Sequence, residues 1–218
     1  MDDGWSLVDD FISAELLPDD PDLEAALASM EAAGLPPHAV TPHQGRLLHI
    51  LARMAGARRI LEIGTLGGYS TIQLARALGE GGRLITLEAN PVHADIALEN
   101  IERAGLSDKV DLRLGLAEDT LAGMDPGAPF DLIFIDADKK STPAYFKAAL
   151  RLSRSGTVII IDNVVRGGEI AGNGKPGRQA RGLRRFFKDA GGNAGLTATA
   201  IQTVGAKGWD GFAIALVD

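Results

Sequence analysis

Short apolar segments and helix-forming segments alternate five times along the chain, and this alternation constrains the fold more than any other feature of the sequence. The predicted strands are 58–64, 82–89, 109–115, 130–137 and 156–162, and the predicted helices that follow them are 69–78, 91–105, 117–124, 141–153 and 178–190. Repeated strand–helix–strand units form right-handed crossovers, which place the strands in a parallel sheet covered by helices on both faces. The nearly continuous apolar strands agree with burial on both faces.

The end of the chain departs from this alternation. Residues 196–204 and 211–217 both have strand character, and only a short connection containing AKGWD lies between them. A parallel crossover needs about a dozen residues or more, so the last strand is predicted to run antiparallel. Residues 1–56 are predicted to be helical. The predicted fold is therefore α/β, with a mostly parallel seven-stranded sheet, an antiparallel last strand and a helical N-terminal part. We expect one domain over residues 1–218, with 57–218 as its α/β core.

Charge and composition exclude several classes of function. The chain has 22 Lys and Arg against 29 Asp and Glu, a net charge of −7, which disfavours bulk binding to nucleic acid or to an anionic membrane. The absence of cysteine excludes disulfides, a thiolate nucleophile and a Cys-ligated metal. No apolar run approaches the roughly 20 residues of a membrane helix. The first residues are acidic where a signal peptide is basic. We therefore expect a cytoplasmic protein that does not enter a membrane.

A glycine-rich turn, EIGTLGGYS at 62–70, follows the first predicted strand and opens a helix. Glycines allow a ligand to approach the backbone, and the start of a helix presents free N–H groups. Leu66 occupies the second glycine position of GxGxxG, which disfavours a dinucleotide site. Glu62 lies inside the strand, where a cationic or amino-bearing ligand would explain it, and Glu88 ends the next strand, where it can accept hydrogen bonds from ribose hydroxyls. The alternative is a tight turn with Glu88 as a solvated strand end.

Oxygen ligands follow two later strands. Asp136 ends the fourth predicted strand, and Asp162 with Asn163 ends the fifth. Two carboxylates and one amide oxygen suit a hard divalent ion such as Mg²⁺. Lys139 lies beside this set, where a cation would lower its pKa and allow it to act as a base. The alternative is that Asp136 caps a loop and the neighbouring lysines are solvated, as in most charge runs.

Five stretches taken together resemble one known family: RILEIGTLGGYST, ITLEANP, FDLIFIDADK, VIIIDNVV and QTVGAKGWDGFAIALV. They are similar to the cation-dependent class I O-methyltransferases, of the catechol and caffeoyl-CoA type, and the last stretch points to the bacterial branch. The resemblance implies a Rossmann-like fold, S-adenosylmethionine (SAM) as cofactor and a homodimer. It also implies a divalent cation, Mg²⁺ with Mn²⁺ or Ca²⁺ as alternatives.

The resemblance implies a role for each matching residue. The cofactor-binding residues would be Val40, Thr41, Glu62, Gly64, Gly68, Ser70, Glu88, Ala117, Glu118 and Asp136. The metal ligands would be Asp136, Asp162 and Asn163, and the catalytic base would be Lys139. In mammalian catechol enzymes a His-Trp pair follows the first metal ligand. Here that pair is Ala137-Asp138, so the aromatic gate of those enzymes is missing.

The expected function is SAM-dependent and metal-dependent methylation of one hydroxyl of a catechol-type small molecule. A tRNA hydroxyuridine O-methyltransferase of the same fold is the alternative, and the acidic charge balance disfavours it. An NAD-dependent oxidoreductase is disfavoured by Leu66, and a regulator without catalysis by the intact metal and base residues. Arg166, the loop 166–177, Trp209 and Asp210 would form either an acceptor lid or an exposed loop. Four arginines, at 178, 181, 184 and 185, would form a solvated face, a dimer contact or an anion site.

Overall fold

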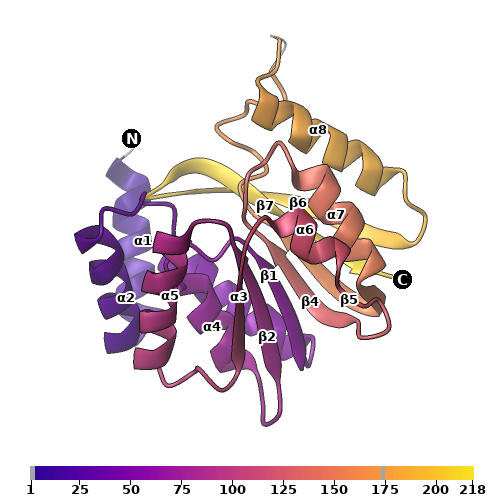
Figure 1. Cartoon of the computed structure of the whole chain (residues 1–218). Coiled ribbons are helices and arrows are strands. Elements are labelled where there is room, and N and C mark those ends of the chain that lie inside the picture. The colour runs from indigo at the N-terminus through magenta and orange to yellow at the C-terminus, as the bar shows by residue number, and fades with distance from the viewer. Residues whose placement is uncertain (1–2, 173–174) are drawn as a thin grey trace.

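Seven strands form a single sheet in the order β3-β2-β1-β4-β5-β7-β6 (Figure 1). The computed structural model describes residues 3–172 and 175–218. The strands are β1 Arg59–Ile63, β2 Arg83–Glu88, β3 Val110–Leu114, β4 Phe130–Ile135, β5 Ser153–Ile161, β6 Leu196–Gly205 and β7 Gly208–Val217. β1 to β5 pair in parallel, and β7 runs antiparallel between β5 and β6. The predicted fold class is confirmed.

The last hairpin is tighter than the sequence suggested. The ladder between β6 and β7 continues through Thr203↔Asp210 and Val204↔Trp209 to Gly205↔Gly208. Only Ala206 and Lys207 connect the strands, and Gly208 has a left-handed φ of 87° that suits the turn. The prediction of a longer connection was wrong, and Trp209 and Asp210 belong to β7.

Eight helices are present in the described residues. They are α1 Asp3–Leu16, α2 Pro21–Ala32, α3 Pro42–Met54, α4 Tyr69–Ala77, α5 Pro91–Arg103, α6 Ala117–Ala122, α7 Thr142–Arg151 and α8 Arg178–Gly191. Proline in the first turn of α2, α3, α5 and α7 has the φ that a helix start requires and needs no N–H partner there. Thr41 and Gln44 complete a capping box at α3. In the part of the chain that the structure describes, no helix has the length and hydropathy of a membrane span.

Each face of the sheet packs against its own set of helices. Ile60 points to the layer of α2 to α5, whereas its neighbour Leu61 points to the layer of α6 to α8. The first core contains Leu48 and Ile72, and the second contains Phe186. Alternate residues of the central strands are therefore buried on opposite faces. This leaves the carboxyl ends of the parallel strands as the edge where polar side chains can gather.

Candidate active site at the carboxyl ends of the strands

The turn after β1 lies directly against the loop after β4. The backbone N–H of Asp136 donates to Ile63 O at 2.9 Å, which continues the β1–β4 pairing by one residue. Gly64 has a φ of 100°, and a Cβ there would lie 2.4 Å from Asp136 O. Only glycine fits this contact, so Gly64 brings the predicted cofactor turn and the predicted metal ligand together. Gly68, with φ 86°, is the N-cap residue directly before α4.

Glu62 is fully buried in β1, beneath the turn. Its carboxylate accepts hydrogen bonds from Ser70 Oγ at 2.6 Å and Thr86 Oγ1 at 2.7 Å, and also from Thr71 Oγ1. Burial raises its pKa to about 7, although the three hydroxyl donors oppose the shift. Because Ser70 and Thr71 lie in the first turn of α4, Glu62 holds the start of that helix against β2.

The stability of the ligand-free protein is expected to depend on Glu62 and pH. The pKa of Glu62 is about 7 in the folded protein, against 4.5 for a glutamate that is fully exposed to water, as in the unfolded chain. As pH rises, the unfolded chain therefore loses this proton first. The contribution is fully present below about pH 4.5 and is lost as pH rises through 7. Between pH 4.5 and 7.5, the free energy of unfolding should fall by about 3 kcal/mol more in the parent protein than in Glu62→Gln.

Urea denaturation at both pH values, in EDTA and without cofactor, measures this difference. Glu24→Gln is the control, because Glu24 is exposed on α2, and its free energy of unfolding should depend on pH as that of the parent protein does. Parallel pH profiles for the parent and Glu62→Gln would contradict the assignment of the shift to burial.

Glu88 is also engaged by the backbone. Its Oε2 accepts from Leu66 N at 2.8 Å and Thr65 N at 3.3 Å, and its Oε1 accepts from Ala89 N and Asn90 N, both at 2.9 Å. A carboxylate offers about four lone-pair positions, so these four donors occupy them. Glu88 therefore fixes the glycine turn, and ribose hydroxyls would have to replace some of these donors.

Asp136, Lys139, Asp162 and Asn163 come together at the ends of β4 and β5. Lys139 is 5% exposed, and its Nζ donates to Asp136 Oδ1 at 2.8 Å. Asp162 is 4% exposed, and its Oδ1 accepts from Asn163 N at 2.8 Å and from Gln44 Nε2 at 3.4 Å. Burial, together with the negative charge of Asp136, raises the pKa of Asp162 to about 7, while Lys139 opposes the shift.

This cluster fits a divalent cation by its chemistry. Two nearby carboxylates, one of them buried, repel each other unless a positive charge lies between them. The described residues contain no group of three or more His, Cys, Asp or Glu side chains that could hold a metal ion, so the predicted site would need the amide oxygen of Asn163 beside the two carboxylates. Burial lowers the pKa of Lys207 in the β6–β7 turn, although the charges of Asp136 and Asp162 oppose the shift.

The other predicted cofactor residues surround this edge of the sheet. Val40 is buried and lines a small cavity with Gln44 and Asp162. Thr41 caps α3, and its N–H donates to Gln44 Oε1 at 3.1 Å. Ala117 and Glu118 begin α6 after β3, where Glu118 is exposed.

A model of the O-methyltransferase family matches residues 15–203. The chain belongs to the O-methyltransferase family. A catechol O-methyltransferase of Mycobacterium tuberculosis is 53% identical to this O-methyltransferase over 210 residues, which are 96% of this chain and 94% of that protein. An O-methyltransferase from Bacillus cereus, solved in complex with SAH, has a TM-score of 0.97 and 54% identity, with 100% of both chains covered.

A further solved structure has the same fold. The O-methyltransferase TomG from Streptomyces achromogenes, involved in tomaymycin synthesis and solved in complex with SAM, has a TM-score of 0.96 and 47% identity. It covers 100% of this chain and 99% of its own. The resemblance to the O-methyltransferases is therefore confirmed.

Sequence reasoning missed several side chains of this O-methyltransferase that support the candidate site. Asp138 Oδ2 accepts from Tyr145 Oη at 2.8 Å, and its Oδ1 accepts from Ser141 N at 3.2 Å. Burial and the Asp138 carboxylate both raise the pKa of Tyr145, so the phenol stays protonated and donates. Asp138 thus ties the loop of Asp136 and Lys139 to α7. The one sequence signal for this role was that Ala137-Asp138 stands where the mammalian catechol enzymes have a His-Trp pair.

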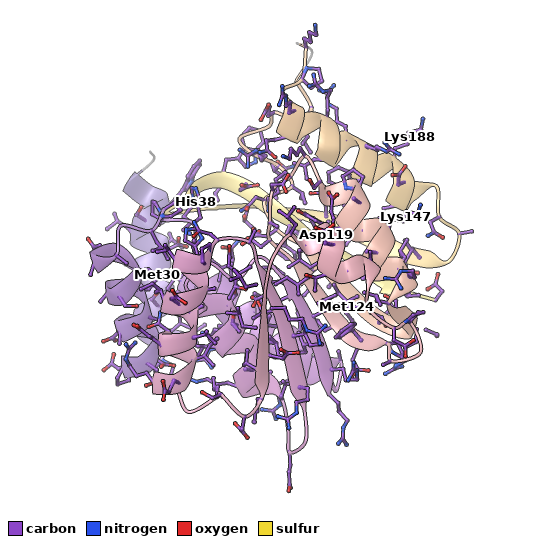
Figure 2. All side chains as sticks on the ribbon, viewed as in Figure 1. Met30, His38, Asp119, Met124, Lys147 and Lys188 are labelled. Atoms are coloured by element: carbon purple, nitrogen blue, oxygen red, sulfur yellow. The ribbon has the colours of Figure 1, made fainter. Side chains whose placement is uncertain are left out.

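The arginines of α8 are not all solvated. Arg184 Nε donates to Ile170 O at 2.8 Å and Arg184 Nη2 donates to Gly172 O at 2.6 Å, while Arg181 Nη1 donates to Pro176 O at 3.0 Å. These bonds fasten the described part of the loop 166–177 to α8. Asn173 and Gly174 of the predicted lid lie outside the described residues. Between α7 and α8 lies a cavity of about 860 Å³, with Lys147 on α7 on its wall (Figure 2).

Proposed function

We propose that this O-methyltransferase transfers the methyl group of SAM to one hydroxyl of a catechol-type aromatic small molecule. The observation that carries the proposal is the pair of carboxylates, Asp136 and Asp162, beside the nearly buried Lys139. The name of the M. tuberculosis relative supports a catechol acceptor. The complexes of the B. cereus and S. achromogenes enzymes support SAM as the methyl donor.

The proposed divalent cation, Mg²⁺ with Mn²⁺ or Ca²⁺ as alternatives, would be held by Asp136, Asp162 and Asn163. When bound, such an ion would supply positive charge that lowers the pKa of the acceptor hydroxyls. Lys139, in its neutral amine form, would accept the proton of the reacting hydroxyl; its Nζ lies 2.8 Å from Oδ1 of Asp136, one of the proposed cation ligands. The glycine turn, Glu88 and Ser70 would orient SAM, with Val40, Thr41, Ala117 and Glu118 around it. Because the sulfonium is already reactive, the chain mainly aligns the two substrates.

Methyl transfer from SAM to a panel of catechols tests the proposal. The assay contains Mg²⁺ or Mn²⁺ and is repeated with EDTA, and a monohydroxy phenol of each scaffold is the matched control. We expect O-methylated product that EDTA abolishes and that the monohydroxy control does not give. Product that survives EDTA would contradict the metal assignment. Binding of SAM with no product from any catechol would contradict the acceptor class.

A second candidate is methylation of a hydroxyuridine in tRNA. Although the chain as a whole is acidic, positively charged side chains outnumber carboxylates on the wall of the cavity between α7 and α8. The five cationic residues are Lys140, Lys147, Arg178, Arg181 and Arg185, and the two acidic residues are Glu118 and Asp189. Such a wall suits a phosphate backbone. Product on undermodified tRNA, with affinity that falls steeply as salt rises, would favour this candidate over the catechol.

We also propose that the working protein is a homodimer whose contact includes α1 and β6. Edge strands are usually protected by charge, yet β6 is a ten-residue edge strand, LTATAIQTVG, with no charged residue. Leu7 and Phe11 on α1 are 68% and 66% exposed, and Ile201 on β6 is 48% exposed. The solvent-accessible surface area of the chain is 10981 Å², whereas a typical folded monomer of this mass has about 9,600 Å². The excess exceeds the roughly 800 Å² that each partner buries in a standard interface.

Phe11→Glu and Ile201→Lys are expected to separate the dimer. Sedimentation should give twice the 22.9 kDa of one chain for the parent protein and 22.9 kDa for each variant. In an isologous contact each substitution places two unpaired charges in the buried interface, one from each subunit. Leu98→Glu, a change at a 49% exposed position on α5, is the control and should stay dimeric. A parent protein that sediments as a monomer at assay concentrations would contradict the proposal.

A further inference from the structure

The segment that leaves β5 carries Asp162 and Asn163 and then turns sharply. Asn163 and Arg166 have left-handed φ values of 52° and 51°, which are unfavourable for residues other than glycine. Gly167 and Gly168 follow with φ of 61° and 84°. A backbone of this shape persists only where its surroundings hold it.

Hydrogen bonds to strand β7 stabilise this backbone conformation. Four consecutive N–H groups, of residues 164–167, donate to β7. Val164 N donates to Gly211 O and Gly167 N donates to Trp209 O, both at 2.9 Å. The two N–H groups between them donate to a side chain: Asp210 Oδ1 accepts from Val165 N at 3.1 Å and from Arg166 N at 2.9 Å.

Asp210 is therefore the side chain at the centre of this attachment. Its Oδ1 also accepts from its neighbour Gly211 N at 3.0 Å, so one oxygen receives three backbone donors. Within residues 3–172 and 175–218, Asp210 Oδ2 has no hydrogen-bond or ion-pair partner. The ring of Trp209 packs on the same segment, since a Cβ at Gly168 would lie 2.7 Å from Trp209 Cη2.

We propose that Asp210 is a positioning residue for the cation site: it fixes the backbone of 164–167 and thereby the placement of Asn163 and Asp162. The inference rests on the proposed function, because it assumes that Asp162 and Asn163 hold a divalent ion. Asp210 acts through the oxygen that accepts backbone N–H groups, and its negative charge is not required. A carboxamide of the same shape should therefore replace it.

Asp210→Ala and Asp210→Asn separate this role from direct coordination. Mn²⁺ affinity is measured by calorimetric titration, and kcat and the KM for SAM are measured on a catechol. Asp210→Ala should weaken Mn²⁺ binding and lower kcat by about 10- to 100-fold, as the loss of a residue that orients a ligand does. The KM for SAM should stay within about twofold. Asp210→Asn keeps the oxygen acceptor and should stay within about threefold of the parent in every measurement.

Thr203→Val is the matched control, because Thr203 pairs with Asp210 across the hairpin. It should leave Mn²⁺ affinity unchanged. If Asp210→Ala does not fold, Asp210→Ser, which keeps a shorter acceptor, takes its place and should show an intermediate loss. Parent-like Mn²⁺ affinity in Asp210→Ala would overturn the inference, and so would equal losses in Asp210→Asn and Asp210→Ala, which would make Asp210 a ligand. A parent protein that binds no Mn²⁺ would overturn the proposed function itself, and the inference with it.

Discussion

Asp162→Ala is expected to lose cation binding and to lower kcat by roughly 100- to 1,000-fold, while the protein still folds. Asp162 is 4% exposed, and burial and the charge of Asp136 both raise its pKa. Without the cation, the ionised Asp162 carboxylate is therefore destabilised by burial and by the charge of Asp136. Replacing it with alanine should not lower the free energy of unfolding at pH 7.5. With excess Mg²⁺, ligand linkage should raise the melting temperature of the parent protein but not of the variant.

Thermal denaturation with Mg²⁺ and with EDTA, together with the methyl-transfer assay, measures both effects. Asp108→Ala, an exposed change in the turn before β3, is the control and should keep both the Mg²⁺ stabilisation and the activity. Full activity in Asp162→Ala would remove Asp162 from the site. A variant that unfolds in EDTA when the parent does not would show that the carboxylate stabilises the fold instead.

Lys139→Ala and Lys139→Arg are expected to lower kcat by about 100- to 10,000-fold, the usual size of a general-base contribution. Arginine keeps the positive charge but does not give up its proton, so it should not restore the reaction. Raising the pH should recover part of the activity in both variants, because hydroxide then ionises more of the acceptor.

Initial rates from pH 6 to 10 test this expectation, with SAM affinity measured separately. Lys188→Ala is the control, since Lys188 is exposed on α8 (Figure 2), and it should match the parent protein. Parent-like rates in Lys139→Arg at neutral pH would exclude Lys139 as the base and assign it to charge pairing with Asp136 alone.

The sheet could be predicted from sequence because each central strand is a continuous apolar run with a helix after it. The candidate ligands could be predicted for the same reason: Asp136 and Asp162 end strands that pair in parallel, so they share one edge. The resemblance added the role of Lys139, whose ion pair with Asp136 spans only three residues.

The contacts that were missed join residues far apart in the chain. Gln44 reaches Asp162 across 118 positions, and Asp210 reaches Val165 across 45. No local pattern encodes such pairs, because they form only when separate layers pack. The hairpin was misjudged for a related reason: Trp209 and Asp210 have no strand periodicity, and they are held in β7 by the segment 164–167 that lies across them.

Helix α8 packs directly against the backbone of Lys139, the predicted base. A Cβ at Gly182 would lie 2.1 Å from Lys139 O and 2.8 Å from Lys140 Cα, so the helix backbone rests on that peptide. The same helix holds Ile170 and Gly172, in the segment after β5, through Arg184. An engineer who moves α8 to admit bulkier acceptors therefore also moves Lys139. Acceptor range and turnover are therefore expected to change together when α8 moves. Changes in β7 do not avoid this coupling, because β7 holds the segment 164–167 next to Asp162 and Asn163.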